Sequence, residues 1–126
     1  MITDLDVAKK LLQLRDSAKN RKYAFDMSIK TVRNLLTRKT CAYTGVKFDR
    51  TYPNKGAFPT VDRIDSEVGY IDGNVVMCTF TVNQMKGNLE NVELLKVAQA
   101  LLKRYDVQTG QRKATAKSTS IRSKKA

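Results

Sequence analysis

Residues 60–86 read TVDRIDSEVGYIDGNVVMCTFTVNQMK, and their pattern predicts two strands followed by a helix. Its first six residues alternate as a strand does, with Val61 and Ile64 as the apolar members. Gly69 and the turn residues at 72–74 separate them from a second apolar run at 75–78, so the pattern predicts a β-hairpin. We expect Thr81 or Asn83 to open a helix that stops at the Gly-Asn pair 87–88.

The same stretch carries side chains suited to metal and phosphate chemistry. A hairpin folded against the following helix would bring Asp62 and Asn83 together. One carboxylate and one amide oxygen, with water completing the shell, suit a hard divalent cation such as Mg²⁺. Lys86 lies three residues after Asn83, so it shares a helix face with it and could neutralise a phosphate oxygen.

Five short motifs in this region resemble the HNH endonuclease family. They are DRID at 62–65, GY at 69–70, GN at 73–74, N-x-x-K at 83–86 and, upstream, C-x-x-T-G at 41–45. Each motif alone is weak, but their order and spacing together are specific. The resemblance covers residues 40 to about 103 and is closest to the histidine-poor form found in small bacteriophage proteins.

The resemblance implies an α+β fold: a ββα-metal hairpin-plus-helix module, here flanked by N-terminal and C-terminal helices. It implies hydrolysis of phosphodiester bonds in DNA with one divalent cation, Mg²⁺ or Mn²⁺. By resemblance, Asp62 and Asn83 are the metal ligands, and Lys86 is a positively charged residue that lies beside the phosphate. By resemblance, Asn74 braces the loop and orients the catalytic base, and it is also expected to be a left-handed turn residue after Gly73.

Two departures from the family pattern concern the cysteines and the general base. Of the zinc-binding C-x-x-C pairs found in many members, only Cys41 remains, with Thr44 in the second place. Cys78 is read as a small buried hydrophobe, so a zinc-free module is expected. The position of the general-base histidine is Arg63, which stays protonated and cannot accept a proton from water.

Arg63 could instead clamp the scissile phosphate in two-pronged fashion. The base would then be Asp65, expected on the same strand face as Arg63, or a metal-bound hydroxide, with Tyr70 as a third candidate. The alternative is an Arg63–Asp65 ion pair that only fixes the strand.

The chain has 126 residues, with 24 Lys and Arg against 12 Asp and Glu and no histidine. The missing histidine excludes Ser-His-Asp and Cys-His catalysis and any His-ligated metal.

The positive charge is concentrated on both sides of a neutral centre. Residues 9–39 contain ten basic and two acidic residues, residues 40–110 contain equal numbers of each, and residues 111–126 contain six basic residues and no acidic one. Basic sequence on both sides of a neutral centre favours nucleic acid, above all double-stranded DNA, as the partner. The candidate phosphate-contacting residues are Lys9, Lys10, Arg15, Lys19, Arg21, Lys22, Lys30, Arg33, Arg38, Lys39, Arg112, Lys113, Lys117, Arg122, Lys124 and Lys125. A solvated helix face is the alternative for each of them singly.

Three segments follow from this pattern. Residues 1–39 are expected to form two basic helices, the first capped by Thr3 or Asp4 and the second by Ser28. Residues 40–110 are expected to form the HNH-like module with a last helix from Asn91, and residues 111–126 are expected to form a disordered basic tail. The acidic N-terminus, the absence of a long apolar run and the two lone cysteines predict an intracellular protein, in the host cytoplasm if phage-encoded.

Two functions fit the sequence. The first is a metal-dependent HNH DNA endonuclease of the phage or mobile-element sort, favoured by Asp62, Asn83 and Lys86. The second is an HNH-like nucleic-acid-binding protein without hydrolysis, in an architectural, packaging-associated or ribonucleoprotein-associated role, favoured by Arg63 and the basic excess. A protein-protein adaptor whose tail orders on a partner is a third reading.

Overall fold

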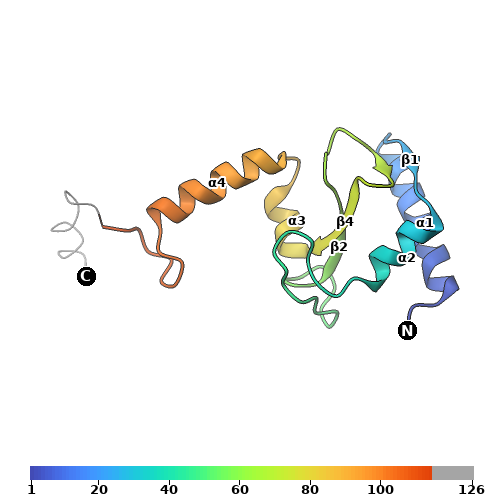
Figure 1. The fold of residues 1–126 in the computed structure, drawn as a ribbon, viewed down its shortest axis with the longest axis horizontal. Helices are drawn as coiled ribbons and strands as arrows, with labels where there is room; N and C mark the ends of the chain where they lie inside the picture. The colour runs from blue at the N-terminus through green and yellow to red at the C-terminus, as the bar shows by residue number, and fades with distance from the viewer. Residues whose placement is uncertain (115–126) are drawn as a thin grey trace. The chain divides into compact units, whose positions relative to one another are not determined.

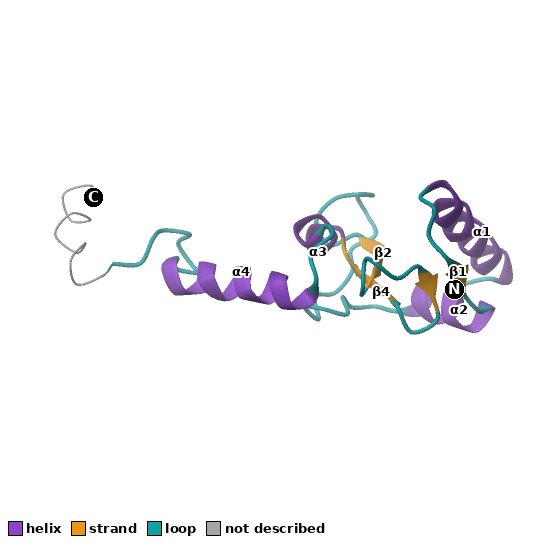
Figure 2. Ribbon diagram, turned by 90° about the horizontal axis from the view of Figure 1, so that it is seen from above, coloured by secondary structure: helices purple, strands orange, loops and turns teal. Residues whose placement is uncertain are grey.

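The computed structural model describes residues 1–114, and contacts divide the chain into two compact units. Met1–Asn91 contains, in chain order, α1 (Asp4–Asn20), β1 (Phe25–Asp26), α2 (Ile29–Thr37), β2 (Pro59–Arg63), β3 (Tyr70–Ile71), β4 (Val75–Thr79) and α3 (Phe80–Lys86) (Figures 1 and 2). α4 (Asn91–Arg104) leads into the second unit, which begins at Val92. The predicted order of two helices, a hairpin and two further helices is confirmed. Of the predicted basic tail, residues 115–126 lie outside the described part.

α1 and α2 begin at the polar caps that the sequence indicated. The Thr3 hydroxyl accepts a hydrogen bond from the Asp6 amide, and the Asp6 carboxylate accepts one from the Thr3 amide, which is a capping box. The Ser28 hydroxyl caps α2 by accepting from the Thr31 amide at 3.1 Å. The apolar faces of both helices join β3 and β4 in one core, whose members include Val7, Leu14, Ala18, Val32, Leu35, Tyr70, Val75 and Met77.

α1 ends in a tight left-handed turn that matters for the site. Lys22 has a φ of 60°, and the Tyr23 amide donates to the Ala18 carbonyl at 2.8 Å, which is the long hydrogen bond of a Schellman motif. This turn fixes the direction in which Arg21 and Tyr23 leave the helix.

The central hairpin pairs β2 and β4 antiparallel, with Asp62 opposite Val76 and Arg63 opposite Val75. β2 ends at Arg63, so the expectation that Asp65 shares a strand face with Arg63 is wrong: Asp65 lies in the loop that follows. The cause is Asn74, whose side chain binds the Asp65 backbone and turns the chain away from the strand.

α3 follows β4 without a loop, because Thr79 is both the last strand residue and the helix cap. Its hydroxyl accepts from the Val82 amide at 3.2 Å, so the helix begins earlier than the predicted Thr81 or Asn83. As predicted, the helix stops before Gly87, which has a φ of 51°.

A short parallel pairing of β1 with β3, which the sequence did not predict, ties the loop after β2 to the N-terminal helices. Phe25 pairs with Tyr70, and the Asp72 carboxylate accepts from the Ser28 amide at 3.0 Å. Gly69 makes this approach possible, because a Cβ atom there would lie 2.2 Å from the Ala24 carbonyl oxygen.

Gly69→Ala is expected to lower the free energy of unfolding by about 2–3 kcal/mol, because backbone atoms must move to admit the methyl group. Urea denaturation measures this value. Gly56→Ala is the matched control: Gly56 has a φ of 49° but open space around it, so only backbone strain of about 1 kcal/mol is expected. Equal losses in the two variants would contradict the close packing at Gly69.

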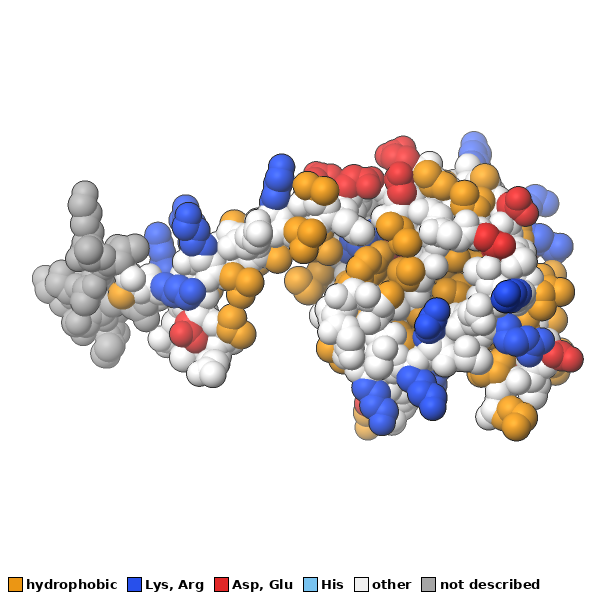
Figure 3. Space-filling model, in the orientation of Figure 1, with side chains coloured by type: hydrophobic (Ala, Val, Ile, Leu, Met, Phe, Trp, Pro, Cys, Tyr) orange, Lys and Arg blue, Asp and Glu red, His pale blue; other side chains and the backbone are white. Residues whose placement is uncertain are grey.

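In the second unit, α4 has no buried residue among those described. Val92, Leu95, Leu101 and Leu102 are exposed, and apolar side chains are visible along this helix in Figure 3. Beyond α4, Asp106 closes a turn by accepting from the amides of Gln108 and Thr109. No helix within residues 1–114 has both the length and the apolar character that crossing a membrane requires.

Candidate functional site

A pocket of about 230 Å³ opens where the end of β2, α3 and the end of α1 meet. Asp62 and Asn83 both line it, although they lie in different elements, so the expected meeting of these two residues is observed. Arg21, Arg63 and Tyr70 line the same pocket, whose surface is mostly polar.

Asp62 is held in place by two partners that contact the same carboxylate oxygen. The Tyr43 hydroxyl donates to Oδ2 at 2.7 Å, and Lys86 Nζ lies 3.1 Å from that atom. Burial raises the pKa of Tyr43 far above its usual value, and the bond to the Asp62 carboxylate raises it further, so this hydroxyl stays a donor. Both described contacts use Oδ2, so neither occupies Oδ1.

Lys86 is 1% exposed and lies inside the fold rather than at the pocket surface. Its ammonium group donates to the Arg63 carbonyl at 3.0 Å and the Ile64 carbonyl at 3.3 Å, besides its ion pair with Asp62. These three oxygens match the three N–H donors of a lysine. The geometry therefore makes Lys86 an internal partner of Asp62 and of the end of β2, and not the phosphate contact expected from its helix face.

Asn83 is half-buried, and its amide nitrogen points back to the hairpin. Nδ2 donates to the Thr60 hydroxyl at 3.0 Å and is 3.4 Å from the Val61 carbonyl. Because the nitrogen is used by β2, the amide oxygen is the atom left for a ligand in the pocket.

Arg63, the residue at the expected general-base position, is buried in an aromatic stack. Its guanidinium carbon lies 3.7 Å from the Tyr23 ring centroid and 5.5 Å from that of Tyr70. Its NH1 donates to the carbonyl oxygens of Ser66 and Val68. The described residues contain no ion pair between Arg63 and Asp65, so that alternative is wrong.

Asn74 organises the loop between β2 and β3. Its Oδ1 accepts from the Asp65 amide, and its Nδ2 donates to the carbonyl oxygens of Asp65, Val68 and Gly69, at distances between 2.9 and 3.2 Å. The left-handed turn residue is Gly73, with a φ of 88°, and not Asn74. The Asp65 carboxylate accepts from the Glu67 amide at 2.9 Å, and Asp65 is not among the residues that line the pocket.

Two residues of the site were not singled out from the sequence. Tyr43 was considered only as one of the two unspecified positions of C-x-x-T-G, and Tyr23 was not considered at all. Tyr43 lies 19 residues before Asp62, and Tyr23 lies 40 residues before Arg63. No local sequence pattern predicts contacts over such separations. An aromatic residue inside a motif is the one hint that could have pointed to Tyr43.

The basic residues of 9–39 lie mainly at the surface: Lys10 and Arg33 are half-buried and the others are exposed. Arg33 is engaged in an ion pair with Asp4 at 2.7 Å. Figure 3 shows Lys and Arg side chains at several separate places on the face that it draws. Of the predicted tail contacts, Arg112 and Lys113 are exposed, and Lys117, Arg122, Lys124 and Lys125 lie outside the described residues.

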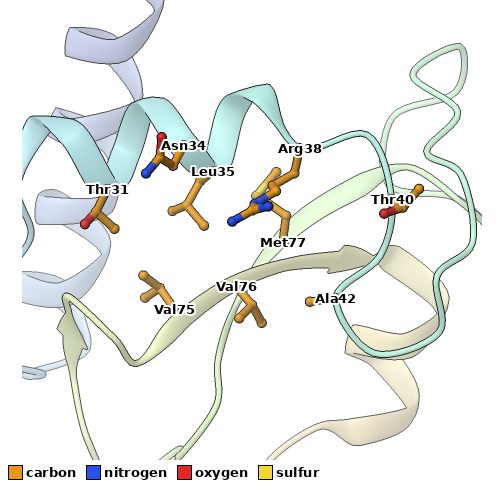
Figure 4. A pocket seen from close by; sticks show the side chains of 9 residues that line it. All are labelled: Thr31, Asn34, Leu35, Arg38, Thr40, Ala42, Val75, Val76 and Met77. Carbon is orange, nitrogen blue, oxygen red and sulfur yellow. The ribbon is translucent and has the colours of Figure 1, made fainter.

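A second hollow, of about 300 Å³, lies between α2 and β4. Figure 4 shows Leu35 of α2 and the C-cap residue Arg38 on one side and Val75, Val76 and Met77 of β4 on the other. No carboxylate lines it, so it offers no charged oxygen to a cation.

The cysteines are buried thiols. Cys41 Sγ accepts from the Thr79 amide, and burial raises the pKa of Cys78 to about 11. Within residues 1–114 there is no group of three or more Cys, Asp or Glu residues that could hold a metal.

The arrangement of hairpin, loop and helix is similar to the fold of an HNH endonuclease, and the expected α+β class is confirmed. The solved structure of PacI, a rare-cutting HNH restriction endonuclease that perturbs DNA, superposes with a TM-score of 0.57 over 79% of this chain and 78% of that one. The two sequences are 22% identical, so the similarity concerns the fold.

One sequence relative comes from a bacteriophage. An uncharacterised 29.0 kDa protein from the dda–modA intergenic region of enterobacteria phage T4 is 31% identical over 90 residues, which is 71% of this chain. The chain spans 36% of the length of that relative. No protein-family model matches the chain.

Proposed function

We propose that this chain is an HNH-type endonuclease that hydrolyses phosphodiester bonds in double-stranded DNA, encoded by a phage or mobile element and active in the host cytoplasm. The observation that carries the proposal is the shared pocket of Asp62 and Asn83, with two arginines beside them. The fold similarity to PacI supports a nuclease, and the T4 relative supports a phage origin.

The donor set fits a divalent cation, Mg²⁺ or Mn²⁺. Asp62 and Asn83 would hold it through a carboxylate and an amide oxygen, since Lys86 and Tyr43 use only Oδ2 of Asp62 and the hairpin uses only Nδ2 of Asn83. When bound, the ion would supply Lewis-acid stabilisation of the phosphate charge and activation of water.

The remaining residues would prepare the site. Lys86 and Tyr43 hold the Asp62 carboxylate in one orientation, and Asn74 holds the loop in shape. The pocket residues include neither a histidine nor a second carboxylate, and the Tyr70 hydroxyl is engaged by Arg21, so no side chain of the pocket is proposed as the base. A missing base lowers a rate on the order of 10²–10⁴-fold, and a slow enzyme is expected.

DNA binding is proposed for the basic residues of 1–39 and for those of 111–126. In the sequence, these segments precede and follow the module at 40–110. Phosphate contacts of this kind act through charge and release counterions, so the affinity is expected to fall steeply with salt.

Nicking of supercoiled plasmid tests the proposal. Wild-type protein is expected to convert it to open circles in Mg²⁺ or Mn²⁺ and to stop when EDTA is added, and a mobility shift should report binding in both conditions. Intact plasmid in every metal, with the mobility shift retained, would reject hydrolysis.

That second outcome would establish the other candidate, an HNH-like binder without hydrolysis. The observation that favours it is Arg63, whose guanidinium is packed against Tyr23 at the position where the family carries its general base.

A further inference from the structure

We propose that Arg21 is the phosphate-binding residue of the pocket, where it contacts the nonbridging oxygens of the DNA phosphate held beside Asp62 and Asn83. This inference rests on the proposed function for its substrate. It gives one of the many basic residues of the N-terminal helices a specific task in the pocket.

The position of Arg21 carries the first step. It is the C-cap residue of α1 and belongs to a different segment from β2 and α3, yet it lines the pocket with Asp62 and Asn83. The Schellman turn at Lys22 fixes its backbone. An exposed residue at the end of α1 thus reaches the pocket formed by the hairpin and α3.

Two tyrosines, Tyr70 and Tyr23, orient the Arg21 guanidinium. Arg21 NH1 donates to the Tyr70 hydroxyl at 3.0 Å, and its guanidinium carbon lies 5.2 Å from the Tyr23 ring centroid. Tyr70 is 6% exposed and belongs to the core, and Tyr23 is half-buried against that core and packs edge-on on Tyr70. The guanidinium is therefore held in place before any ligand arrives.

The third step is the number of unused donors. A guanidinium has five N–H groups, and within residues 1–114 the Arg21 side chain makes one hydrogen bond, to Tyr70. Arg63 differs, because it is 6% exposed and its NH1 is committed to loop carbonyls. Because Arg21 is exposed whereas Arg63 is buried, Arg21 is the arginine of the pocket that is accessible for two-pronged recognition of a phosphate.

The charge of the pocket fits an anion. Asp62 is the one acid among its lining residues, and Lys86 balances it at 3.1 Å. The positive charges of Arg21 and Arg63 are then left without a carboxylate in the pocket, which favours a phosphodiester.

Two measurements test the inference independently of one another. The first is titration with inorganic phosphate, followed by tyrosine fluorescence, because Tyr70 and Tyr23 contact Arg21 and the chain has no tryptophan. Wild type should bind phosphate, Arg21→Ala should not, and Arg50→Ala should bind as wild type does. Arg50 is exposed and lies outside the pocket, so the Arg50→Ala substitution removes the same charge at a different place. Absence of binding by wild type, or equal binding by Arg21→Ala, would overturn the inference.

The second measurement is the plasmid-nicking rate at saturating DNA. Arg21→Ala is expected to lower it roughly a hundredfold. Arg21→Lys should recover only part of the loss, because an ammonium group cannot bind a phosphate bidentately. Tyr70→Phe should lower the rate less, through lost positioning, and Arg50→Ala should leave it unchanged. If wild type and Arg21→Ala nick equally fast, the role proposed for Arg21 is rejected while the nuclease activity is retained. If wild type binds phosphate through Arg21 but never nicks, the nuclease activity is rejected while the phosphate site is retained.

Discussion

An Asp62→Asn variant is expected to nick supercoiled plasmid on the order of 10²-fold more slowly than wild type. The substitution keeps the shape of the side chain and an acceptor oxygen for Tyr43 and Lys86, but it removes the charge that would hold a divalent cation. Asn83→Ala, which removes the second oxygen, is expected to give a loss of similar size. Initial rates over a series of Mg²⁺ concentrations measure both effects, and raising Mg²⁺ should restore part of the Asp62→Asn activity by mass action.

Matched controls separate this loss from general damage. Asp16→Asn and Asn34→Ala remove the same side-chain types at exposed positions outside the pocket, and both should nick as wild type does. DNA binding by Asp62→Asn should persist, since the basic residues are unchanged. Wild-type nicking by Asp62→Asn at limiting Mg²⁺ would contradict the assignment of Asp62 as a metal ligand.

The sequence was sufficient where structure follows from neighbouring residues. Thr3 and Ser28 cap their helices as expected, because a hydroxyl before an apolar helical stripe acts locally. The hairpin was also predictable, since strand alternation and the turn around Gly73 lie within a short stretch. From these elements, the meeting of Asp62 and Asn83 followed by simple geometry.

The sequence was insufficient where a side chain is defined by a distant partner. Lys86 was expected to face a phosphate, because lysine on a helix is usually exposed. Its burial depends on Asp62 and on two carbonyl groups at the end of β2, more than twenty residues earlier. Arg63 likewise packs on Tyr23, forty residues before it. Such long-range pairs have no periodic pattern that could reveal them.

Lys86→Met is expected to lower the free energy of unfolding by about 3–5 kcal/mol. Methionine fills similar space but leaves the Asp62 carboxylate, 7% exposed, with Tyr43 as its one described partner. It also leaves the Arg63 and Ile64 carbonyl groups without their donor. Urea denaturation near neutral pH measures the loss, and Lys103→Met, at an exposed position of α4, is the control.

A double-mutant cycle shows whether the loss comes from the ion pair itself. If Lys86 mainly balances Asp62, then Asp62→Asn in the Lys86→Met background removes the uncompensated buried charge and should restore part of the stability. If Lys86 acts only through the two carbonyl groups, the two substitutions should be additive. A coupling well above about 0.5 kcal/mol, the usual scatter for independent sites, would establish the pair. Because the same pair fixes the orientation of the proposed metal ligand, Lys86→Met should also slow nicking under conditions where the variant is folded, and undiminished nicking would mean that Asp62 needs no such support.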